Sequence, residues 1–399
     1  MLSTKEVKEI REALQSFKSP LFIYDDDPDG LCSFLLLYDY VKEGRGVILK
    51  TSSSVDANFI KLIHLYQFDS VFILDTPIVE QDFIDQIKVP VYWVDHHEVL
   101  KRNNVKYYNP RKNDPEAYIP TTRMAYQVNP NPDKLWLAML GCLSDYMIPD
   151  FKNEFLKRYP DLMDKKSEIG DALFKDQIGE LERVFRFLLK GKSSEVRKCI
   201  NILTRIKTPY EILNQETSKG KYLWKRFQKI DVEYQKMYQF AQSKKTRSKL
   251  LLYEYNDNKW SFTAYLSNEL STKNPKKVVI IARKSNGSMK VSLRAKFNIR
   301  DALKRTLEKV EGKGGGHPNA CGAVIEEHDW EHFLNYFKQE IDKDYPCKKK
   351  VVKKKVVKVK KDHTKQSKPK SVGKSVKNKT NPEKSSKHSK KKVKKEVKK

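Results

Sequence analysis

Three short apolar segments constrain the fold of this chain most, because each runs directly into acids or histidines. Residues 20–24 precede an acid-rich turn, residues 70–74 precede Asp75, and residues 90–94 precede an Asp-His-His triplet. Runs of this length that are rich in β-branched and aromatic residues predict buried strands. Ligands of open α/β sheets bind at the carboxyl ends of the strands, so the segments predict one polar site at one sheet edge.

Helical patterns separate these apolar segments. A further strand is expected at 46–50, and helices are expected near 31–41, 55–66 and 79–87. Strands that alternate with helices through short connections predict a parallel, doubly wound sheet. The predicted fold class is therefore α/β, with a parallel doubly wound N-terminal sheet domain, a helical connector, a smaller α/β C-terminal domain and a disordered basic tail.

The chain has 399 residues, which is enough for two domains with sizeable cores. We predict a first α/β domain over 1–150 and a charged, helix-periodic connector over 151–247. A new strand pattern begins near 249 and predicts a second, smaller α/β domain over 248–345. The remaining residues, 346–399, form the predicted tail.

The positive charge of the chain is concentrated at its carboxyl end. The formal net charge is +29, and residues 348–399 contribute 24 Lys against three acids. A composition of Lys, Val, Ser, Thr and Pro without a periodic core predicts disorder. Such a polycation is suited to bind a polyanion or, in a cell with a nucleus, to direct import; a purely solubilising tail is the alternative.

The cysteine count and the hydropathy pattern bear on the compartment. The five cysteines form no CxxC pair and their number is odd, which favours a reducing compartment. No run of about 18 apolar residues is present, so no membrane association is expected. The N-terminus begins an amphipathic helix and does not resemble a signal peptide. We expect a cytoplasmic location, or a nuclear one if the host is eukaryotic.

The turn after the first strand carries Asp25, Asp26, Asp27 and Asp29. Carboxylates gathered at one strand end repel one another unless a cation lies among them, and their oxygens are the hard ligands that Mg²⁺ and Mn²⁺ favour. The alternative is a solvated turn in which an acid caps the next helix. Asp145, which ends an apolar helix expected over 133–146, is a further candidate, although by itself it would be taken for a surface acid.

A glycine-rich segment in the C-terminal part has a pattern suited to anion binding. Consecutive glycines let backbone N–H groups approach an anion closely, as in a nest, and a nearby guanidinium on a strand suits bidentate phosphate contact. A flexible hairpin loop beside a surface arginine is the alternative. The candidate substrate-binding residues of this region are Ser292, Arg294, Gly314, Gly315, Gly316 and His317.

Taken together, five segments resemble the DHH phosphoesterase superfamily in order and spacing. They read DDDPDGLCS from residue 25, VFILD from 71, DHH from 95, GCLSD from 141 and GGGHPNACG from 314, and the last has VSLR upstream. The superfamily includes RecJ-type nucleases, nanoRNases and family II inorganic pyrophosphatases. The resemblance covers about residues 18–345 and is strongest to the RecJ-like single-strand exonuclease branch with a DHH-associated C-terminal domain. The tail lies outside it.

The resemblance implies a centre with two Mn²⁺ or Mg²⁺ ions. One ion would be held by Asp25, Asp27 and Asp75. The other would be held by Asp29, Asp75, His96 and Asp145, so that Asp75 bridges the pair. Many relatives have His where Asp25 stands, so the first site here would be all carboxylate.

The resemblance also implies roles around these ligands. Asp95 would orient a histidine, and His97 would face the scissile phosphate. Arg294 and His317, with the glycine segment, would grip the phosphate or terminal nucleotide of the substrate. Asp26 matches no ligand position and is expected to point away.

The expected activity is hydrolysis of single-stranded DNA or RNA from an end, with 5′→3′ polarity taken from RecJ alone and replication or repair proteins as further partners. The tail favours a polymer substrate, because a long phosphate backbone gains counterion-release affinity that a dinucleotide lacks. The alternatives are a nanoRNase or cyclic-dinucleotide phosphodiesterase, and a non-catalytic replication factor. The filled ligand positions argue against the last. The separate oligonucleotide-binding domain of RecJ has no evident counterpart.

Overall fold

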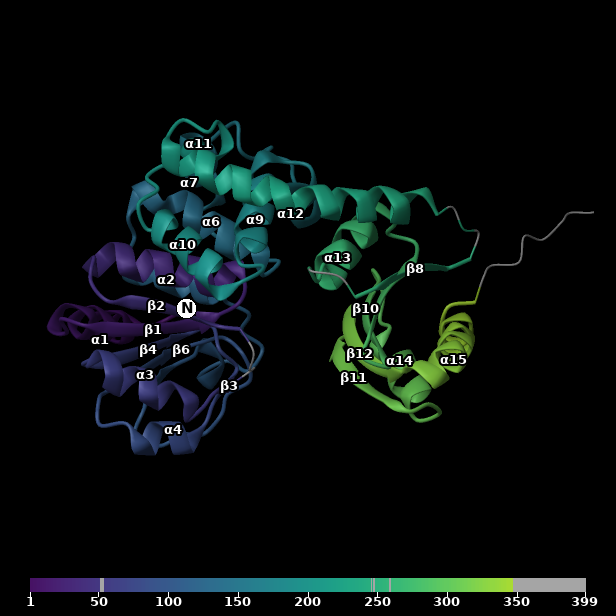
Figure 1. Cartoon of the computed structure of the whole chain (residues 1–399), viewed down its shortest axis with the longest axis horizontal. Helices are drawn as coiled ribbons and strands as arrows, with labels where there is room; N and C mark the ends of the chain where they lie inside the picture. The colour runs from purple at the N-terminus through teal and green to yellow at the C-terminus, as the bar shows by residue number, and fades with distance from the viewer. Residues whose placement is uncertain (51–53, 245, 247, 258–259, 347–399) are drawn as a thin grey trace, which may run out of the picture. The chain divides into compact units, whose positions relative to one another are not determined.

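A computed structural model describes residues 1–50, 54–244, 246, 248–257 and 260–346. The tail predicted to be disordered lies outside these residues from position 347 onward. Within them the predicted fold class is confirmed: a parallel sheet comes first, helices follow, and a second α/β region closes the described part (Figure 1).

The N-terminal sheet has five parallel strands in the order β2-β1-β4-β6-β7. Its strands are β1 (Pro20–Asp25), β2 (Arg45–Leu49), β4 (Ser70–Leu74), β6 (Val91–Val94) and β7 (Lys106–Tyr108), and a separate short ladder joins β3 (Ser54–Val55) to β5 (Ile78–Val79). The chain adds β2 on one side of β1 and then crosses to the other side for β4. This places a topological switch point between β1 and β4, where ligands of such sheets bind.

Helices cover both faces of this sheet, because alternate side chains of each strand point to opposite faces. Phe22 and Phe72 belong to the core shared with α2, whereas Ile23 and Ile73 belong to the core shared with α3 and α4. Figure 1 shows α2 on one side of the sheet and α3 and α4 on the other. The helices of this part are α1 (Thr4–Ser16), α2 (Pro28–Val41), α3 (Asn58–Tyr66), α4 (Gln81–Gln86), α5 (Thr121–Val128) and α6 (Leu135–Ser144).

The turn between β1 and α2 is compact for a specific reason. The Asp27 carboxylate caps α2 by accepting from the backbone N–H of Gly30 at 3.0 Å. A Cβ on Gly30 would lie 2.8 Å from the backbone nitrogen of Asp25. Only glycine therefore lets the helix start so close to the strand end, and this brings the acids of the turn together.

A helical region follows, and its apolar side chains join the core on the α2 face of the sheet. The helices are α7 (Lys152–Arg158), α8 (Ile169–Phe174), α9 (Gln177–Leu188), α10 (Ser193–Leu203), α11 (Tyr210–Leu213) and α12 (Ser218–Ser243). Figure 1 shows the long helix α12 running from this region toward α13 and β8. The Tyr234 hydroxyl of α12 donates to the carboxylate of Glu269, so a buried hydrogen bond joins α12 to α13.

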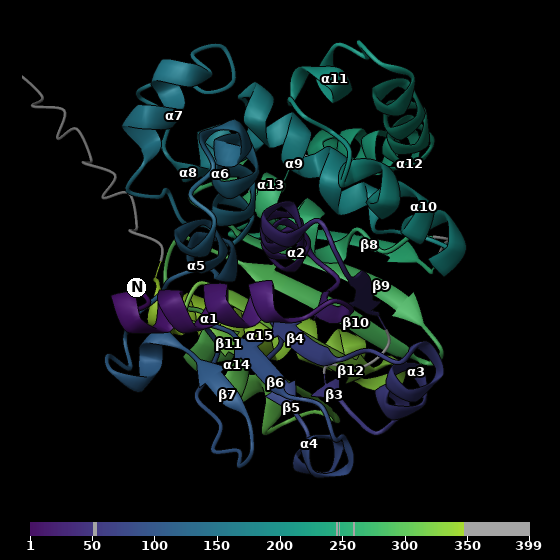
Figure 2. The same cartoon turned by 90° about the vertical axis from the view of Figure 1, so that its left-hand side faces the viewer.

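The C-terminal sheet has the order β11-β12-β10-β9-β8 and is antiparallel except for the β8–β9 pair. Its elements are β8 (Leu250–Asn256), α13 (Thr263–Lys273), β9 (Val278–Ser285), β10 (Ser288–Arg294), α14 (Arg300–Leu307), β11 (Gly312–His317), β12 (Ala320–Glu326) and α15 (Trp330–Asp344). Figure 2 shows these strands with α14 and α15 against them. Short 3-10 turns span Pro110–Lys112, Pro132–Lys134 and Glu327–Asp329.

The glycine-rich segment expected as a loop is instead the exposed edge strand β11, and this part of the prediction is wrong. Strand β11 pairs with β12, and along a strand successive N–H groups point to opposite sides, so they do not converge as in a nest. A Cβ on Gly314 would lie 2.6 Å from the Gly322 carbonyl oxygen, and Gly316 has a φ of +134°. These two glycines serve close strand pairing and the turn that follows.

No helix of the described residues is long and apolar enough to cross a membrane.

Candidate metal centre and substrate pocket

Acids and histidines from four elements meet at the carboxyl ends of β1, β4 and β6. In each of three overlapping groups the ligand atoms lie within 4.8 Å of one another: Asp25, Asp27 and Asp75; Asp29, His96 and Asp145; and Asp75, His96 and His97. All six side chains named as ligands from the sequence are therefore brought together. The strand order explains this, because β1, β4 and β6 are neighbours in the sheet.

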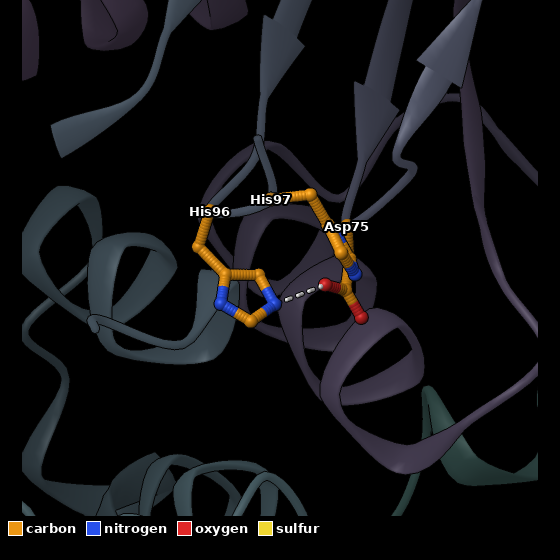
Figure 3. A group of neighbouring side chains, drawn as sticks. All are labelled: Asp75, His96 and His97. Carbon is orange, nitrogen blue, oxygen red and sulfur yellow. Dashed lines mark ion pairs between the residues drawn. The ribbon is translucent and has the colours of Figure 1, made fainter. Parts of the chain in front are cut away.

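His96 joins the two halves of this cluster. Its Nε2 lies 3.2 Å from a carboxylate oxygen of Asp75 and 3.5 Å from one of Asp145. Figure 3 shows the His96 ring directed at the Asp75 carboxylate. Burial lowers the pKa of His96, which favours the neutral imidazole that metals bind. His96 is thus a neutral imidazole whose Nε2 lies near two carboxylates and could serve as a metal ligand.

Asp75 is held in an uncommon backbone conformation at the end of β4. Its φ is +55°, a region that non-glycine residues seldom adopt, and its side chain is 3% exposed. The Asp75 N–H donates to the Val94 carbonyl at 3.0 Å, and the Thr121 hydroxyl donates to its carboxylate at 3.3 Å. Backbone strain of this kind concentrates at functional sites, because the surrounding structure must hold it in place.

Asp29 lies fully buried against the first turn of α5. Its two carboxylate oxygens accept from the backbone N–H groups of Thr121 at 2.9 Å and Thr122 at 2.8 Å. The start of a helix carries unpaired N–H groups and favours negative charge, so α5 offsets part of the cost of burying this acid. Nothing in the sequence pattern of residues 95–121 indicated this contact.

Asp145 follows α6 directly and is held by Tyr118. The Tyr118 hydroxyl donates to a carboxylate oxygen of Asp145 at 2.9 Å and lies 2.7 Å from its backbone carbonyl. The next residue, Tyr146, has a φ of +57°.

The carboxylates of the cluster are electrostatically unfavourable together. Burial raises the pKa of Asp25 to about 7, and the Asp27 carboxylate adds to the rise. Burial also raises the pKa values of Asp29, Asp75 and Asp145, with neighbouring acids contributing in each case. A divalent cation among these oxygens would relieve both effects. The donor set therefore fits a hard divalent metal.

Asp95 orients His97 and not the proposed ligand His96. One Asp95 oxygen lies 2.7 Å from Nδ1 of His97, and the other accepts from the His97 backbone N–H at 3.0 Å. Tyr107 donates to the same Asp95 carboxylate at 3.3 Å. Burial lowers the pKa of His97, but the hydrogen bond to Asp95 and the negative charges of the nearby carboxylates together outweigh burial, so the pKa is raised on balance. The expectation that Asp95 positions a histidine thus applies to His97.

The second group of candidate residues lies on the C-terminal sheet. Arg294 is fixed by three hydrogen bonds: its Nε donates to Asn268 at 2.6 Å, and its Nη1 donates to the carbonyls of Leu293 and Cys321 at 2.9 and 3.0 Å. A hollow of about 570 Å³ is lined by Arg294 with Lys290 and Arg283. Several cations around one hollow are suited to hold a phosphate.

The hollow brings some of the predicted substrate residues together and not others. Ser292 and Gly314 line it, and the Ser292 hydroxyl is paired with that of Ser267 at 2.9 Å. Gly315, Gly316 and His317 are exposed on β11 and are not among its described lining residues. Sequence reasoning missed Arg283, Lys290 and Lys313, which also line the hollow. For Lys290 the available signal was its place between the apolar residues Met289 and Val291 of β10.

Comparison with known proteins agrees with this architecture. Residues 21–143 match the model of the DHH family, N-terminal domain, and residues 250–343 match the DHHA1 domain. No curated protein sequence matches the chain at a significant level. This chain is a DHH-family protein with a DHHA1 domain.

Solved structures share the fold at low sequence identity. RecJ in complex with Mn²⁺ from Thermus thermophilus aligns with a TM-score of 0.54 at 16% identity over 85% of this chain and 54% of that chain. An exonuclease RecJ bound to manganese aligns with a TM-score of 0.51 at 15% identity over 85% and 94%. The DHH domain of a member of a family of ribosomal proteins aligns with a TM-score of 0.59 at 14% identity over 84% and 89%.

These likenesses establish the DHH-family phosphoesterase fold of RecJ. This chain spans about half the length of the Thermus RecJ chain.

Proposed function

We propose that this protein is a metal-dependent phosphodiesterase that hydrolyses single-stranded nucleic acid from an end, with two Mn²⁺ or Mg²⁺ ions at the acid and histidine cluster. One observation carries the proposal. The six potential ligands form two groups of three, and Asp75 of one group lies 3.2 Å from His96 of the other. Two adjacent sites rich in anionic oxygen are the arrangement expected for in-line phosphoryl displacement.

The metal ligands would divide between two ions. Asp25, Asp27 and Asp75 would hold one, and Asp29, Asp75, His96 and Asp145 the other. Bound ions of this kind supply Lewis-acid chemistry, activating water as a nucleophile and offsetting negative charge on a phosphate.

His97 would contact the scissile phosphate. Because Asp95 engages Nδ1 of His97, Nε2 is the ring atom left for a ligand. The raised pKa favours the imidazolium, in which Nε2 carries a proton and can donate to a phosphate oxygen. Asp95 would act through His97 as a positioning residue, with Tyr107 fixing the Asp95 carboxylate in turn.

Arg294 would hold a further phosphate of the substrate. Asn268 and two backbone carbonyls fix its guanidinium, so little side-chain entropy remains to be lost on binding. Lys290 and Lys313 would add charge around the same hollow. Ser292, the glycines of β11 and His317 stay proposed contacts of a terminal nucleotide.

A degradation assay tests the activity. Single-stranded DNA and RNA, labelled at the 5′ or the 3′ end, are incubated with the full-length protein and Mn²⁺ beside labelled di- and trinucleotides. We expect Mn²⁺-dependent release of mononucleotides from the polymers, with 5′→3′ polarity by analogy with RecJ. Cleavage of the shortest substrates alone would replace the exonuclease with a nanoRNase-type activity.

Matched variants connect the activity to the cluster. Asp75→Asn and His96→Ala should abolish hydrolysis, whereas Asp26→Asn should retain it, because Asp26 lies in the same turn but is exposed and belongs to none of the ligand groups. The metal proposal fails if the first two variants cleave as well as the parent. Mn²⁺ binding without cleavage of any substrate would favour the non-catalytic alternative.

A further inference from the structure

We propose that a basic surface binds the phosphate backbone of single-stranded nucleic acid. The surface lies at the end of the N-terminal sheet opposite the acid and histidine cluster, called here the ligand cluster. The surface, called here the α10 surface, consists of Arg45, Arg197, Lys198, Arg205 and Lys207. It goes beyond the proposed hydrolysis and does not depend on it, because binding here involves none of the metal ligands.

The strand register places the α10 surface far from the ligand cluster. Arg45 pairs with Leu21 at the beginning of β1, whereas Asp25 ends the same strand. Helix α2 likewise starts beside the acids and ends near Lys42, and its 14 residues span about 20 Å at 1.5 Å per residue. A ligand on this surface therefore cannot be the phosphate that meets the metal centre.

Two hollows give the surface its shape. One, of about 520 Å³, is lined by Arg45, Arg197, Lys198 and Arg205; the other, of about 670 Å³, is lined by Arg205 and Lys207 and extends to Lys42 and Lys219. Because Arg205 lines both, the hollows adjoin. The basic lining is thus continuous over more than one nucleotide-sized space.

Helix α10 explains why these charges lie side by side. Arg197, Lys198 and Arg205 are exposed, whereas Val196, Cys199, Ile200 and Leu203 on the opposite face are buried. Ser194, Arg197, Lys198 and Asn201 repeat at helical spacing, so they share one face of α10, and Arg205 lies in the turn that follows the end of the helix at Leu203. From 194 to 201 this face extends about 10 Å, which is enough for about two phosphates of an extended strand, and Arg205 lengthens the basic surface beyond it.

The charges of the α10 surface are available to a ligand. Among the described residues no carboxylate forms an ion pair with Arg197, Lys198, Arg205 or Lys207. The two acids of the larger hollow are already engaged: Asp39 by Lys42 and Lys134, and Asp133 by Arg158. Glu195, on the same helix, pairs with Arg226 at 2.9 Å. The surface therefore presents a net positive charge.

Aromatic rings among the cations favour nucleic acid over an acidic peptide. The Arg45 guanidinium lies 4.3 Å from the ring centre of Tyr66, which is 47% exposed, and Lys198 lies 4.6 Å from that of Tyr222. Single-strand binding proteins combine a basic groove with rings on which bases stack. A carboxylate peptide would use the charges but not the rings. The surface would hold a strand at a distance from the site where its end is cut.

Charge reversal in the full-length protein tests the proposal. Binding of fluorescein-labelled oligo(dT) and oligo(U) of about 20 nucleotides is measured by anisotropy in EDTA, so that hydrolysis plays no part, between about 50 and 200 mM salt. The test variant is R197E/K198E/R205E. We expect its affinity to fall about tenfold or more and the slope of log K against log salt to shrink by about 2, since each lost phosphate contact on a single strand removes about 0.7.

A second triple variant controls for net charge. K304E/K338E/K343E changes the charge of the protein equally on exposed positions of α14 and α15, and both variants keep the same tail. It should leave the affinity within about twofold and the slope unchanged. Equal losses in the two triples would overturn the proposal, because they would show that only total charge matters.

Two further measurements keep the result decisive. R197Q/K198Q/R205Q removes the charges without reversing them and replaces the first variant if that one fails to fold. Photo-crosslinking of thiouridine-containing RNA should label peptides with Tyr66 or Tyr222 in the parent and lose that label in the triple variant. Displacement of the RNA by polyglutamate at equal charge concentration, or an absence of crosslinks to these peptides, would count against nucleic acid as the ligand.

Discussion

At the scale of single residues, four acids in one short turn have different surroundings. Asp25 and Asp27 share a ligand group with Asp75, and Asp29 is buried against α5 in another. Asp26, between them, is exposed. The alternation of side chains at the end of β1 produces this difference, because successive residues of a strand point to opposite sides. Adjacent substitutions should therefore have unlike effects.

Metal binding should follow this difference. We expect Asp75→Asn to weaken Mn²⁺ affinity by about 100-fold or more, since it removes a charge from a buried ligand. Asp26→Asn should leave the affinity close to that of the parent. Calorimetric titration of Mn²⁺ measures both, and a thermal melt of each metal-free variant verifies the fold. Equal affinity in the parent and the Asp75 variant would contradict the assignment.

The pH dependence of stability should depend on the metal. The pKa of Asp25 is raised from 3.8 to about 7 by burial and by Asp27. The folded state then binds this proton more tightly than the unfolded state, so the free energy of unfolding of the metal-free protein should fall as pH rises from about 4 to 7. The raised pKa values of Asp29, Asp75 and Asp145 act in the same sense.

Urea unfolding over this pH range, in EDTA and in saturating Mn²⁺, measures the effect. Bound metal favours the ionised carboxylates, so the fall should be much smaller with Mn²⁺. Asp25→Asn should flatten the curve in EDTA. Identical curves with and without metal would show that these carboxylates are not the ligands.

At the scale of elements, β11 shows how glycine serves strand pairing. A Cβ on Gly314 would meet the Gly322 carbonyl at 2.6 Å and the Ala323 Cβ at 2.8 Å, whereas a Cβ on Gly315 would meet no atom within 4 Å. The same three-glycine run therefore contains one position that packing requires and one that it leaves open. A substitution at Gly315 can therefore test whether a ligand contacts the backbone of β11.

Two alanine variants separate these roles. Gly314→Ala should destabilise the protein by about 1–3 kcal/mol, because β11 must shift away from β12. Gly315→Ala should leave stability nearly unchanged but weaken oligonucleotide binding if the β11 backbone approaches a phosphate. Chemical denaturation and anisotropy measure the two effects. Unchanged binding in Gly315→Ala would remove this glycine from the proposed substrate contacts.

At the scale of the whole molecule, charge is distributed in three places. The ligand cluster is anionic, the α10 surface is cationic, and residues 348–399 carry a net charge of +21, from 24 Lys and three acids. A long nucleic acid would gain counterion-release affinity from both cationic regions, and a dinucleotide would gain little. A comparison of long and short substrates should therefore separate binding by the two cationic regions from the hydrolysis step.

Removal of residues 348–399 should weaken binding of a long single strand and reduce its salt dependence, while hydrolysis of a dinucleotide, where the parent shows it, stays the same. Binding at several salt concentrations and a dinucleotide assay test this together. The matched control is Lys→Gln substitution throughout the tail, which removes its charge and keeps its length. An unchanged salt slope would exclude the tail from nucleic-acid binding.

The sequence by itself determined which N-terminal segments form strands and that helices alternate with them along the chain, because short apolar runs that end in acids fit few structures other than buried strands. It also predicted a polar site at the strand ends, since the carboxyl ends of parallel strands meet at one sheet edge. The proposed ligand set of Asp25, Asp27, Asp29, Asp75, His96 and Asp145 came from the resemblance to the DHH superfamily, and the structure brings these side chains together. The sequence did not predict β7, Tyr118, Thr121 or Thr122, because irregular chain carries no periodicity.

The tertiary structure decided what depends on contacts between distant residues. The order β2-β1-β4-β6-β7 placed the switch point between the two strands that carry most of the acids. Pairing with β12 made a strand of a segment whose glycines resembled a loop. The α10 surface likewise arises only when Arg45 of the sheet meets the exposed face of a helix about 150 residues further along the chain. Local patterns set the elements, and packing set which of their side chains meet.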